Sequence, residues 1–445
     1  MSRRAVLVGA LSTVGVAVIA AVAVAVASGA ETRSPPSDAT TGRTSASPAP
    51  TTSAAATVRA VDGGADYYGR FDGGLPDDDG FFPIAVWFAS VTSMSDATAD
   101  REMGLNTYVE LTANSSLELI ADSGMHAIPS VPLDGAAGVL VADEVDMWAG
   151  PGDGTWTGSY PGDGQVCTDD VACGYSIMAK LTGDLPAGLM TVANFGKGVA
   201  FWESDAEAQR FLEFTDVVSA DTYWFTDPNI CGATEGGWGP GDGETLPDAE
   251  CRVAENYGWT VEHVRSLVSP AGSKPVWQFV EVGQPFGDGP SVTGAQIRAA
   301  VWSGIIHGAR GVVYFNHGFG DLCSTENVLR DACGDAVREE VTALNRQLLD
   351  LAPALNAPFV DGLLRIDGGA EAAVKLVDDG FTVFAGATRA NDGDVSFTIG
   401  CRSATSALVV GEDRSIPIVD GRFSDRFADG DAVHVYRLEG GTCGL

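Results

Sequence analysis

Short apolar segments alternate with segments of helical periodicity between residues 81 and 349. Eight of the apolar segments have the length of a strand and nearly continuous hydrophobicity, which is typical of parallel strands buried on both faces. These eight segments span residues 82–88, 106–111, 126–130, 138–144, 189–194, 217–224, 275–281 and 311–316. Helical patterns span residues 95–103, 115–121, 206–214, 261–268, 293–307 and 337–349.

The number of strand–helix units predicts how the sheet closes. Eight units over roughly 260 residues match an α/β fold of the (β/α)8 type, the TIM barrel. A doubly wound open sheet is the alternative, and the barrel is favoured because eight strands is the number at which such a sheet closes. We therefore expect a barrel over residues 61–355.

The pattern changes after Pro358. Short apolar runs then follow one another, with Gly- and Asp-containing turns between them and no helical periodicity. This arrangement is typical of an all-β sandwich. The sequence therefore predicts a small C-terminal β-sandwich domain over residues 356–445.

The first sixty residues have a different composition. Arg3 and Arg4 precede an uncharged run over residues 5–27, and Ser, Thr, Pro and Ala dominate residues 31–60. Residues 1–30 fit either a cleaved signal peptide or an uncleaved membrane anchor. Both readings place the rest of the chain outside the cytoplasm, secreted or tethered to the outer face of the cell membrane. The Ser- and Thr-rich segment cannot bury a core and is predicted to be a disordered linker.

The charge of the chain limits its partners. The formal net charge is −34, with 26 Lys and Arg against 60 Asp and Glu. Nucleic acids are therefore excluded as expected partners, because phosphate binding needs clustered Lys and Arg. Neutral or cationic partners fit this balance better.

All eight cysteines follow the linker, and an even count in an exported chain favours disulfides. Their order in the sequence does not fix the pairing, but the spacing suggests four pairs of near neighbours. These are Cys167–Cys173, Cys231–Cys251, Cys323–Cys333 and Cys401–Cys443. A zinc site is disfavoured because Cys-x-x-Cys is absent, and we expect neither a metal nor another cofactor.

Two glutamates stand where barrel strands are predicted to end. Glu144 ends the fourth strand and Glu281 ends the seventh. The catalytic residues of barrel enzymes lie at the carboxyl ends of the strands. One carboxyl group can protonate a glycosidic oxygen while the other attacks the anomeric carbon. We therefore expect Glu144 to be the acid/base and Glu281 the nucleophile, against the alternative of structural strand-end carboxylates.

The pair of glutamates on strands four and seven resembles the large clan of retaining glycoside hydrolases, all of which are (β/α)8 barrels. That clan usually has Asn-Glu on strand four, where this chain has Asp143-Glu144. The Asn normally contacts the 2-hydroxyl of the sugar. The resemblance also implies that Tyr223, after strand six, hydrogen-bonds the nucleophile. It covers roughly residues 80–440 at the level of architecture, and no single family is assignable.

Other polar and aromatic residues near the predicted strand ends are candidates for substrate binding. Sugar rings have apolar faces that stack on aromatic side chains, and polar groups fix their orientation. The candidates are Trp87, Asp143, Asp146, Trp148, Asn194, Asp221, Tyr223, Trp224, Asn316 and His317. Loop structure, strand-end capping or barrel packing are the competing interpretations for each of them.

These observations predict an exported retaining glycoside hydrolase that cleaves O-glycosidic bonds of a poly- or oligosaccharide. The alternative is a non-catalytic carbohydrate-binding or cell-surface barrel protein, because a fold does not dictate a function.

Overall fold

Eight parallel strands form the predicted barrel. The computed structural model describes residues 56–440 except 242, 288, 321–322, 379, 390–392 and 401–402. The strands are β2 (Ile84–Ala89), β3 (Thr107–Leu111), β4 (His126–Ile128), β5 (Val139–Asp143), β6 (Thr191–Phe195), β7 (Val217–Ala220), β8 (Val276–Glu281) and β9 (Val312–Phe315). They pair in the order β4-β3-β2-β9-β8-β7-β6-β5. Backbone bonds from Ala137 N to Ala127 O (2.8 Å) and from Leu140 N to Pro129 O (2.9 Å) bridge the two end strands.

Side chains of alternating direction fill the barrel and cover its outside. Trp277 and Phe279 of β8 pack inside, in one cluster with residues of β2, β3 and β9. Val280, the residue before Glu281, belongs instead to the outer cluster, which also contains residues of the helices. Successive side chains of a strand point to opposite faces, one to the barrel interior and the next to the surrounding helices. Because both faces are buried, the strands are apolar at nearly every position. It also assigns Glu281 to the inward parity of β8.

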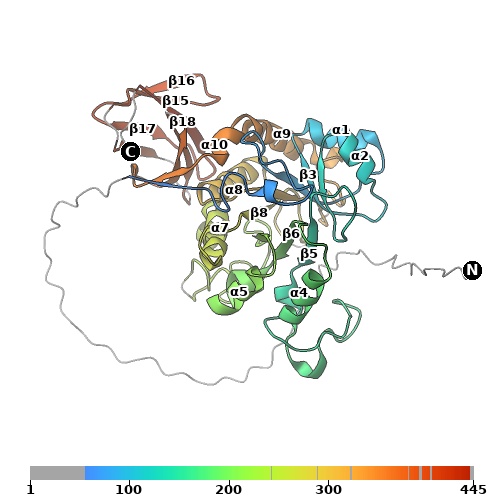
Figure 1. Ribbon diagram of the computed structural model, residues 1–445. Coiled ribbons are helices and arrows are strands. Elements are labelled where there is room, and N and C mark those ends of the chain that lie inside the picture. The colour runs from blue at the N-terminus through green and yellow to red at the C-terminus, as the bar shows by residue number, and fades with distance from the viewer. Residues whose placement is uncertain are drawn as a thin grey trace, which may run out of the picture. The chain divides into compact units, whose positions relative to one another are not determined.

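Helices surround the barrel strands (Figure 1). They are α1 (Met94–Glu102), α2 (Leu117–Asp122), α3 (Val145–Trp148), α4 (Gly174–Gly183), α5 (Asp205–Leu212), α6 (Asp248–Cys251), α7 (Glu255–Leu267), α8 (Gly294–Ile306), α9 (Asp335–Asp350) and α10 (Ala352–Asn356). A capping box begins α8, where Thr293 Oγ1 accepts from Gln296 N at 3.2 Å and Gln296 Oε1 accepts from Thr293 N at 2.9 Å. Helix α7 begins six residues before the predicted start, and Gly258 within that extension lets it approach Ser303 and His307 closely.

Two antiparallel sheets form the C-terminal sandwich. Its strands are β10 (Phe359–Asp361), β11 (Leu364–Asp367), β12 (Ala370–Val377), β13 (Gly380–Ala387), β14 (Asp394–Ile399), β15 (Ser406–Val409), β16 (Arg414–Pro417), β17 (Arg422–Arg426) and β18 (Val433–Glu439). With β1 (Thr57–Arg59) at its edge, one sheet has the order β1-β10-β12-β13-β18-β15-β16, and the other has the order β11-β14-β17. The predicted (β/α)8 barrel followed by an all-β sandwich is confirmed.

Strand β1 (Thr57–Arg59) corrects the predicted linker. The linker predicted over residues 31–60 includes these residues, but they pair with β10 of the sandwich. Arg59 Nε contacts Asp361 Oδ2 at 2.8 Å, and its guanidinium lies 4.3 Å from the ring centroid of Phe359. The sequence could not reveal this pairing, because the partner strand lies about three hundred residues away.

The sandwich packs directly on helix α8. Trp302 of α8 meets Phe384 of β13 with ring centroids 5.1 Å apart. Ser303 donates to Glu371 Oε1 at 2.5 Å, and His307 bridges Glu371 and Glu262 at 3.0 and 2.8 Å. Barrel and sandwich accordingly belong to one compact unit.

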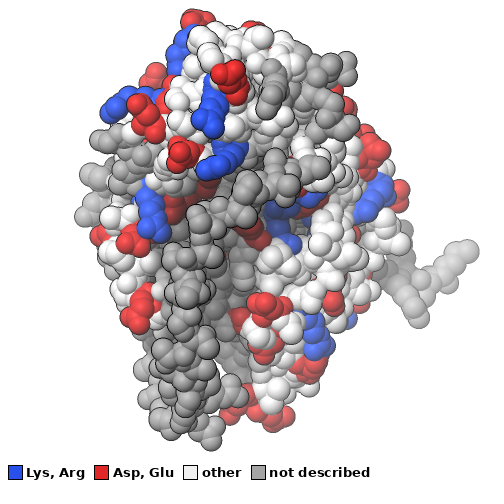
Figure 2. Space-filling view, turned by 90° about the vertical axis from the view of Figure 1, so that its left-hand side faces the viewer, with Lys and Arg blue, Asp and Glu red and all other residues white. Residues whose placement is uncertain are grey.

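Three of the four suggested disulfides are present. Cys167–Cys173, Cys231–Cys251 and Cys323–Cys333 are bonded, whereas Cys401 and Cys443 lie outside the described residues. Within the described part of the chain, no helix is long and apolar enough to cross a membrane. The apolar run at 5–27 also lies outside that part. In Figure 2, acidic and basic side chains are interspersed on the visible described surface.

Candidate active site

Left-handed backbone conformations gather at the carboxyl ends of the barrel strands. Phe88 (φ 48°), Glu110 (φ 58°), Glu144 (φ 51°) and Tyr223 (φ 42°) lie at or just after the ends of β2, β3, β5 and β7. Such conformations cost on the order of 1–3 kcal/mol for residues other than glycine, and they cluster at functional sites. Four of the ten described non-glycine residues with a positive φ thus lie on the face of the barrel that the sequence singled out.

Glu144 lies between the end of β5 and the start of α3. Its backbone N donates to Asn194 O of β6 at 2.9 Å. A Cβ on Gly196 would lie 3.2 Å from Glu144 Oε1, so the carboxyl group lies against the bare backbone after β6. Burial, and then the negative charges of Asp143 and Asp146, raise the pKa of Glu144 to about 8. A carboxylic acid that keeps its proton at neutral pH is suited to general acid catalysis.

A chain of hydrogen bonds orients Asp143. Ser219 of β7 donates to Asn194 Oδ1 at 2.8 Å, and Asn194 Nδ2 donates to Asp143 Oδ1 at 2.9 Å. Burial of the carboxyl group raises the pKa of Asp143 to about 6, although the residue keeps an exposed edge. Asn194 therefore lies next to Asp143 but is itself buried, at 1% exposure.

Asp146 and Asn316 bind backbone groups rather than facing outward. Asp146 is buried and accepts from Gly196 N at 3.1 Å and Val199 N at 2.8 Å. Asn316 Oδ1 accepts from Leu329 N at 2.9 Å. Both were predicted to contact substrate, and the structure instead gives them the competing role of holding the loops after β6 and β9. His317 is also buried, with its ring against Phe315 and neighbouring aromatic rings.

Glu281 is fully buried at the end of β8. The Tyr257 hydroxyl lies 2.8 Å from both carboxylate oxygens, and Thr226 donates to Oε1 at 3.0 Å. Tyr257, at the start of α7, also accepts from Phe225 N at 3.0 Å, so its proton points to the carboxylate. Burial raises the pKa of Glu281, while these hydrogen bonds oppose the increase. The tyrosine next to Glu281 is therefore Tyr257 and not the predicted Tyr223.

Tyr223 instead lies beside Asp221, the residue directly after β7, and the two side chains interact electrostatically. Asp221 is only 7% exposed, and its Oδ1 has no hydrogen-bond partner. Burial, followed by the charges of Glu144 and Asp143, raises the pKa of Asp221 well above its usual range. An unpaired buried oxygen of this kind is uncommon in native proteins and needs an explanation. The hydroxyl group of a ligand would supply the missing donor.

Two residues around Asp143 and Glu144 were not predicted. Glu110 of β3 accepts from Ser130 Oγ at 2.9 Å, and burial raises its pKa to about 7. Its penultimate place in a predicted strand was a signal that could have identified it. Lys197 contacts Asp227 at 2.6 Å and Glu235 at 2.7 Å, and its positive charge lowers the pKa of Glu144. Nothing in the local sequence distinguishes this lysine.

The three tryptophans predicted to bind substrate have different environments. Trp87 packs inside the barrel, with its ring centroid 5.3 Å from that of Phe279. Trp224 is fully buried among the outer helices and donates to Thr260 Oγ1 at 2.9 Å. Trp224 points outward because the alternation of β7 continues past the strand, with Val217 and Tyr223 in the inner cluster and Val218, Ala220 and Trp224 in the outer clusters. Trp148 is partly exposed, and its Nε1 donates to Asp143 O at 2.8 Å.

Replacing Trp224 tests this correction. We expect Trp224→Ala to lower the free energy of unfolding by about 3–5 kcal/mol, because a large buried side chain leaves a cavity. The control is Trp238→Ala, since Trp238 is 54% exposed; we expect a change within about 0.5 kcal/mol. Urea unfolding followed by circular dichroism measures both. Equal stability of the two variants would contradict the buried placement.

No protein-family model matches this chain, and no curated protein matches it. Solved structures do resemble it. An α-amylase from Geobacillus thermoleovorans, solved with acarbose, is 9% identical with a TM-score of 0.48, over 81% of this chain and 99% of that one. A GH30 endoxylanase from Clostridium papyrosolvens is 11% identical with a TM-score of 0.42, over 81% and 97%. An α-amylase from Anoxybacillus is 10% identical with a TM-score of 0.41, over 83% and 100%.

These matched proteins are glycoside hydrolases. At such low identities, the roles of the site residues rest on the geometry of this chain alone.

Proposed function

We propose that this protein is an exported retaining glycoside hydrolase acting on a poly- or oligosaccharide. The observation that carries the proposal is the environment of Glu144, where burial and two neighbouring carboxylates raise the pKa to about 8. A protonated Glu144 donates its proton to the glycosidic oxygen as the bond to the anomeric carbon breaks. The three disulfides support export, because they persist in oxidising compartments.

In this mechanism Glu281 attacks the anomeric carbon and forms a glycosyl ester. Glu144, now ionised, takes a proton from water, whose oxygen displaces Glu281 and releases the sugar. The donors Tyr257 and Thr226 support this role, because they stabilise the ionised carboxylate before attack. A retaining mechanism needs the two carboxyl groups about 5–5.5 Å apart.

Asp221 is the competing candidate for the second carboxyl group. Glu281 has no exposed surface, whereas Asp221 has an unpaired oxygen and feels the charge of Glu144 directly. We assign Asp221 to a substrate hydroxyl and Glu281 to the attack, and variants of both residues are needed to separate these roles.

Exposed aromatic side chains support a carbohydrate ligand. Among the described residues, the aromatic side chains with large exposed areas are Tyr160, Trp202, Trp238 and Phe319. They follow β5, β6, β7 and β9, so all four lie beyond the carboxyl ends of barrel strands. Aromatic rings combined with a few polar groups are the usual components of sugar sites.

The test is incubation of the protein with a panel of neutral glycans, followed by proton NMR of the first product. We expect turnover of at least one glycan and retention of the anomeric configuration. Inversion would contradict the double displacement and favour carboxyl groups about 6.5–9.5 Å apart. Binding without turnover, unchanged in Glu144→Gln and Glu281→Gln, would favour a non-catalytic carbohydrate-binding barrel.

A further inference from the structure

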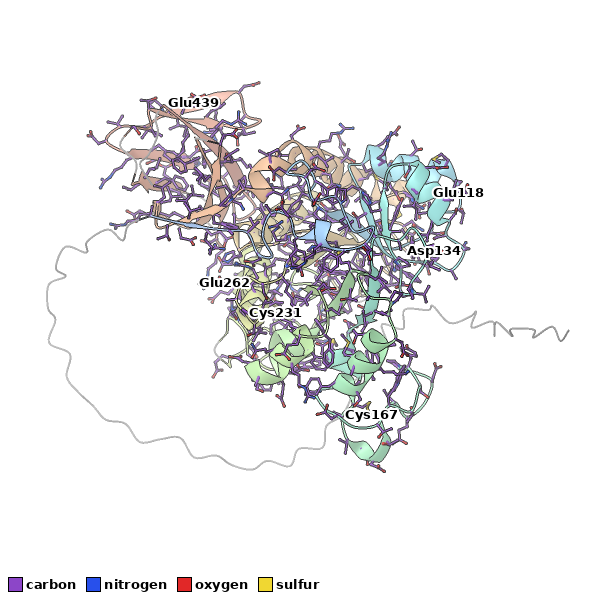
Figure 3. All side chains as sticks on the ribbon, in the orientation of Figure 1. Glu118, Asp134, Cys167, Cys231, Glu262 and Glu439 are labelled. Atoms are coloured by element: carbon purple, nitrogen blue, oxygen red, sulfur yellow. A yellow bond between two sulfur atoms is a disulfide. The ribbon has the colours of Figure 1, made fainter. Side chains whose placement is uncertain are left out.

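The end of α3 and the segment between α3 and α4 carry a row of three aromatic rings that starts beside Asp143. The centroids of Trp148 and Tyr160 are 5.8 Å apart, and those of Tyr160 and Trp156 are 5.4 Å apart. Trp148 begins the row, because its Nε1 donates to Asp143 O at 2.8 Å. Figure 3 shows this segment, marked by Cys167, extending away from the barrel beyond α4.

The segment has a defined structure. Thr157 N donates to Val166 O, and Thr168 N donates to Thr155 O, both at 2.9 Å. The Cys167–Cys173 disulfide closes the end of this small hairpin. The rings are consequently held in place before any ligand arrives, which lowers the entropy cost of binding.

The polar groups of the two indoles already have partners. Trp148 Nε1 is bound to Asp143 O, and Trp156 Nε1 donates to Ser159 O at 2.8 Å. Trp148 and Trp156 also pack in part against the core cluster near α4, and Tyr160 meets Trp148 at 50° and Trp156 at 85°. The ring surfaces that these contacts leave uncovered are the parts of the side chains available to a ligand. Tyr160, in the middle of the row, is 47% exposed.

An open depression of about 520 Å³ lies at the far end of the row. Its lining combines Trp156 with polar side chains of the segment and of α4: Asp153, Thr155, Thr157, Ser176 and Lys180. An aromatic surface flanked by hydroxyl, carboxylate and ammonium groups suits a neutral sugar better than an apolar ligand.

We propose that Trp148, Tyr160 and Trp156 form a binding platform for successive sugar units of a chain that extends outward from Asp143. This inference rests on the proposed function for the position of the reaction, but the binding of a sugar chain does not depend on turnover. The platform implies that the substrate is an oligo- or polysaccharide, of which at least two sugar units bind outside the reaction centre.

The experiment measures the affinity of soluble oligosaccharides of increasing length, by calorimetry, for the wild type and for Tyr160→Ala. The ligands come from whichever neutral polysaccharide retards the wild-type protein in affinity electrophoresis. We expect the dissociation constant of the longer oligosaccharides to rise roughly 3- to 10-fold, the equivalent of one lost ring contact. The dissociation constants of mono- and disaccharides should not change.

Two control variants separate a platform from a structural role. Tyr160→Phe keeps the ring and should bind long chains within about twofold of the wild type. Val171→Ala removes an exposed aliphatic side chain of the same segment and should have no effect. An equal loss for short and long ligands, or no loss in Tyr160→Ala, would overturn the platform.

The platform and the proposed reaction can fail separately. If Glu281→Ala loses turnover but still binds long oligosaccharides more tightly than short ones, both the hydrolase and the platform are supported. If no glycan is turned over but Tyr160→Ala still weakens the binding of long chains, the platform stands and the hydrolase is rejected. Turnover that is independent of chain length, with unchanged binding in Tyr160→Ala, rejects the platform alone.

Discussion

Glu281→Ala is expected to lower turnover by a factor on the order of 10⁴ or more, the scale of loss when a covalent nucleophile is removed. The side chain is buried at the end of β8 and accepts hydrogen bonds from Tyr257 and Thr226. Without it, the anomeric carbon has no partner for the first displacement. Initial rates on the best glycan of the panel measure the loss.

Azide distinguishes a missing nucleophile from a misfolded site. In Glu281→Ala a small anion can occupy the vacated space and attack the anomeric carbon, giving a glycosyl azide of inverted configuration. We expect this rescue in Glu281→Ala and not in Asp221→Ala. Rescue of Asp221→Ala with an inverted product would transfer the nucleophile role to Asp221, whose Oδ1 is buried and unpaired.

A neighbouring substitution serves as a matched control. Tyr257→Phe removes a hydrogen bond to Glu281 and keeps the carboxylate. We expect a partial loss of turnover and a higher apparent pKa on the acid limb of the rate profile, because one stabilising donor of the ionised form is gone. An unchanged acid limb would mean that Glu281 is not the group titrating there.

Glu144→Gln is expected to lower turnover by about 10²–10⁴-fold and to remove the alkaline limb of the rate profile. With the pKa of Glu144 raised to about 8, wild-type kcat/KM should fall as the pH rises through about 8, because the acid loses its proton. An acidic leaving group departs without being protonated, so turnover of substrates that carry one should fall much less in Glu144→Gln. An alkaline limb that persists in Glu144→Gln would contradict this assignment.

The same group predicts how stability depends on pH. A carboxyl group with a raised pKa binds more protons in the folded than in the unfolded state between its ordinary pKa of 4.5 and about 8. The free energy of unfolding should therefore decrease as the pH rises across that window. Glu144→Gln should flatten the decrease. Glu118→Gln, on an exposed position of α2, should not.

Local patterns explain why much of the fold was predictable. The strands β2 to β9 are buried on both faces, so their apolar runs stand out without knowledge of their partners. The disulfides Cys167–Cys173, Cys231–Cys251 and Cys323–Cys333 join near neighbours, and the capping box of α8 needs only residues three apart. Once the strands were counted, the strand-end positions of Glu144 and Glu281 followed.

The sequence by itself thus determined the barrel, the sandwich and the strand ends that carry carboxylates. Only the tertiary structure decided which side chains meet there. Tyr257 rather than Tyr223 reaches Glu281, because the start of α7 lies against the end of β8, whereas Tyr223 packs in the inner cluster of the barrel. Strand β1 likewise joins a sheet formed hundreds of residues later. Such contacts depend on packing between distant elements, which periodicity along the chain does not encode.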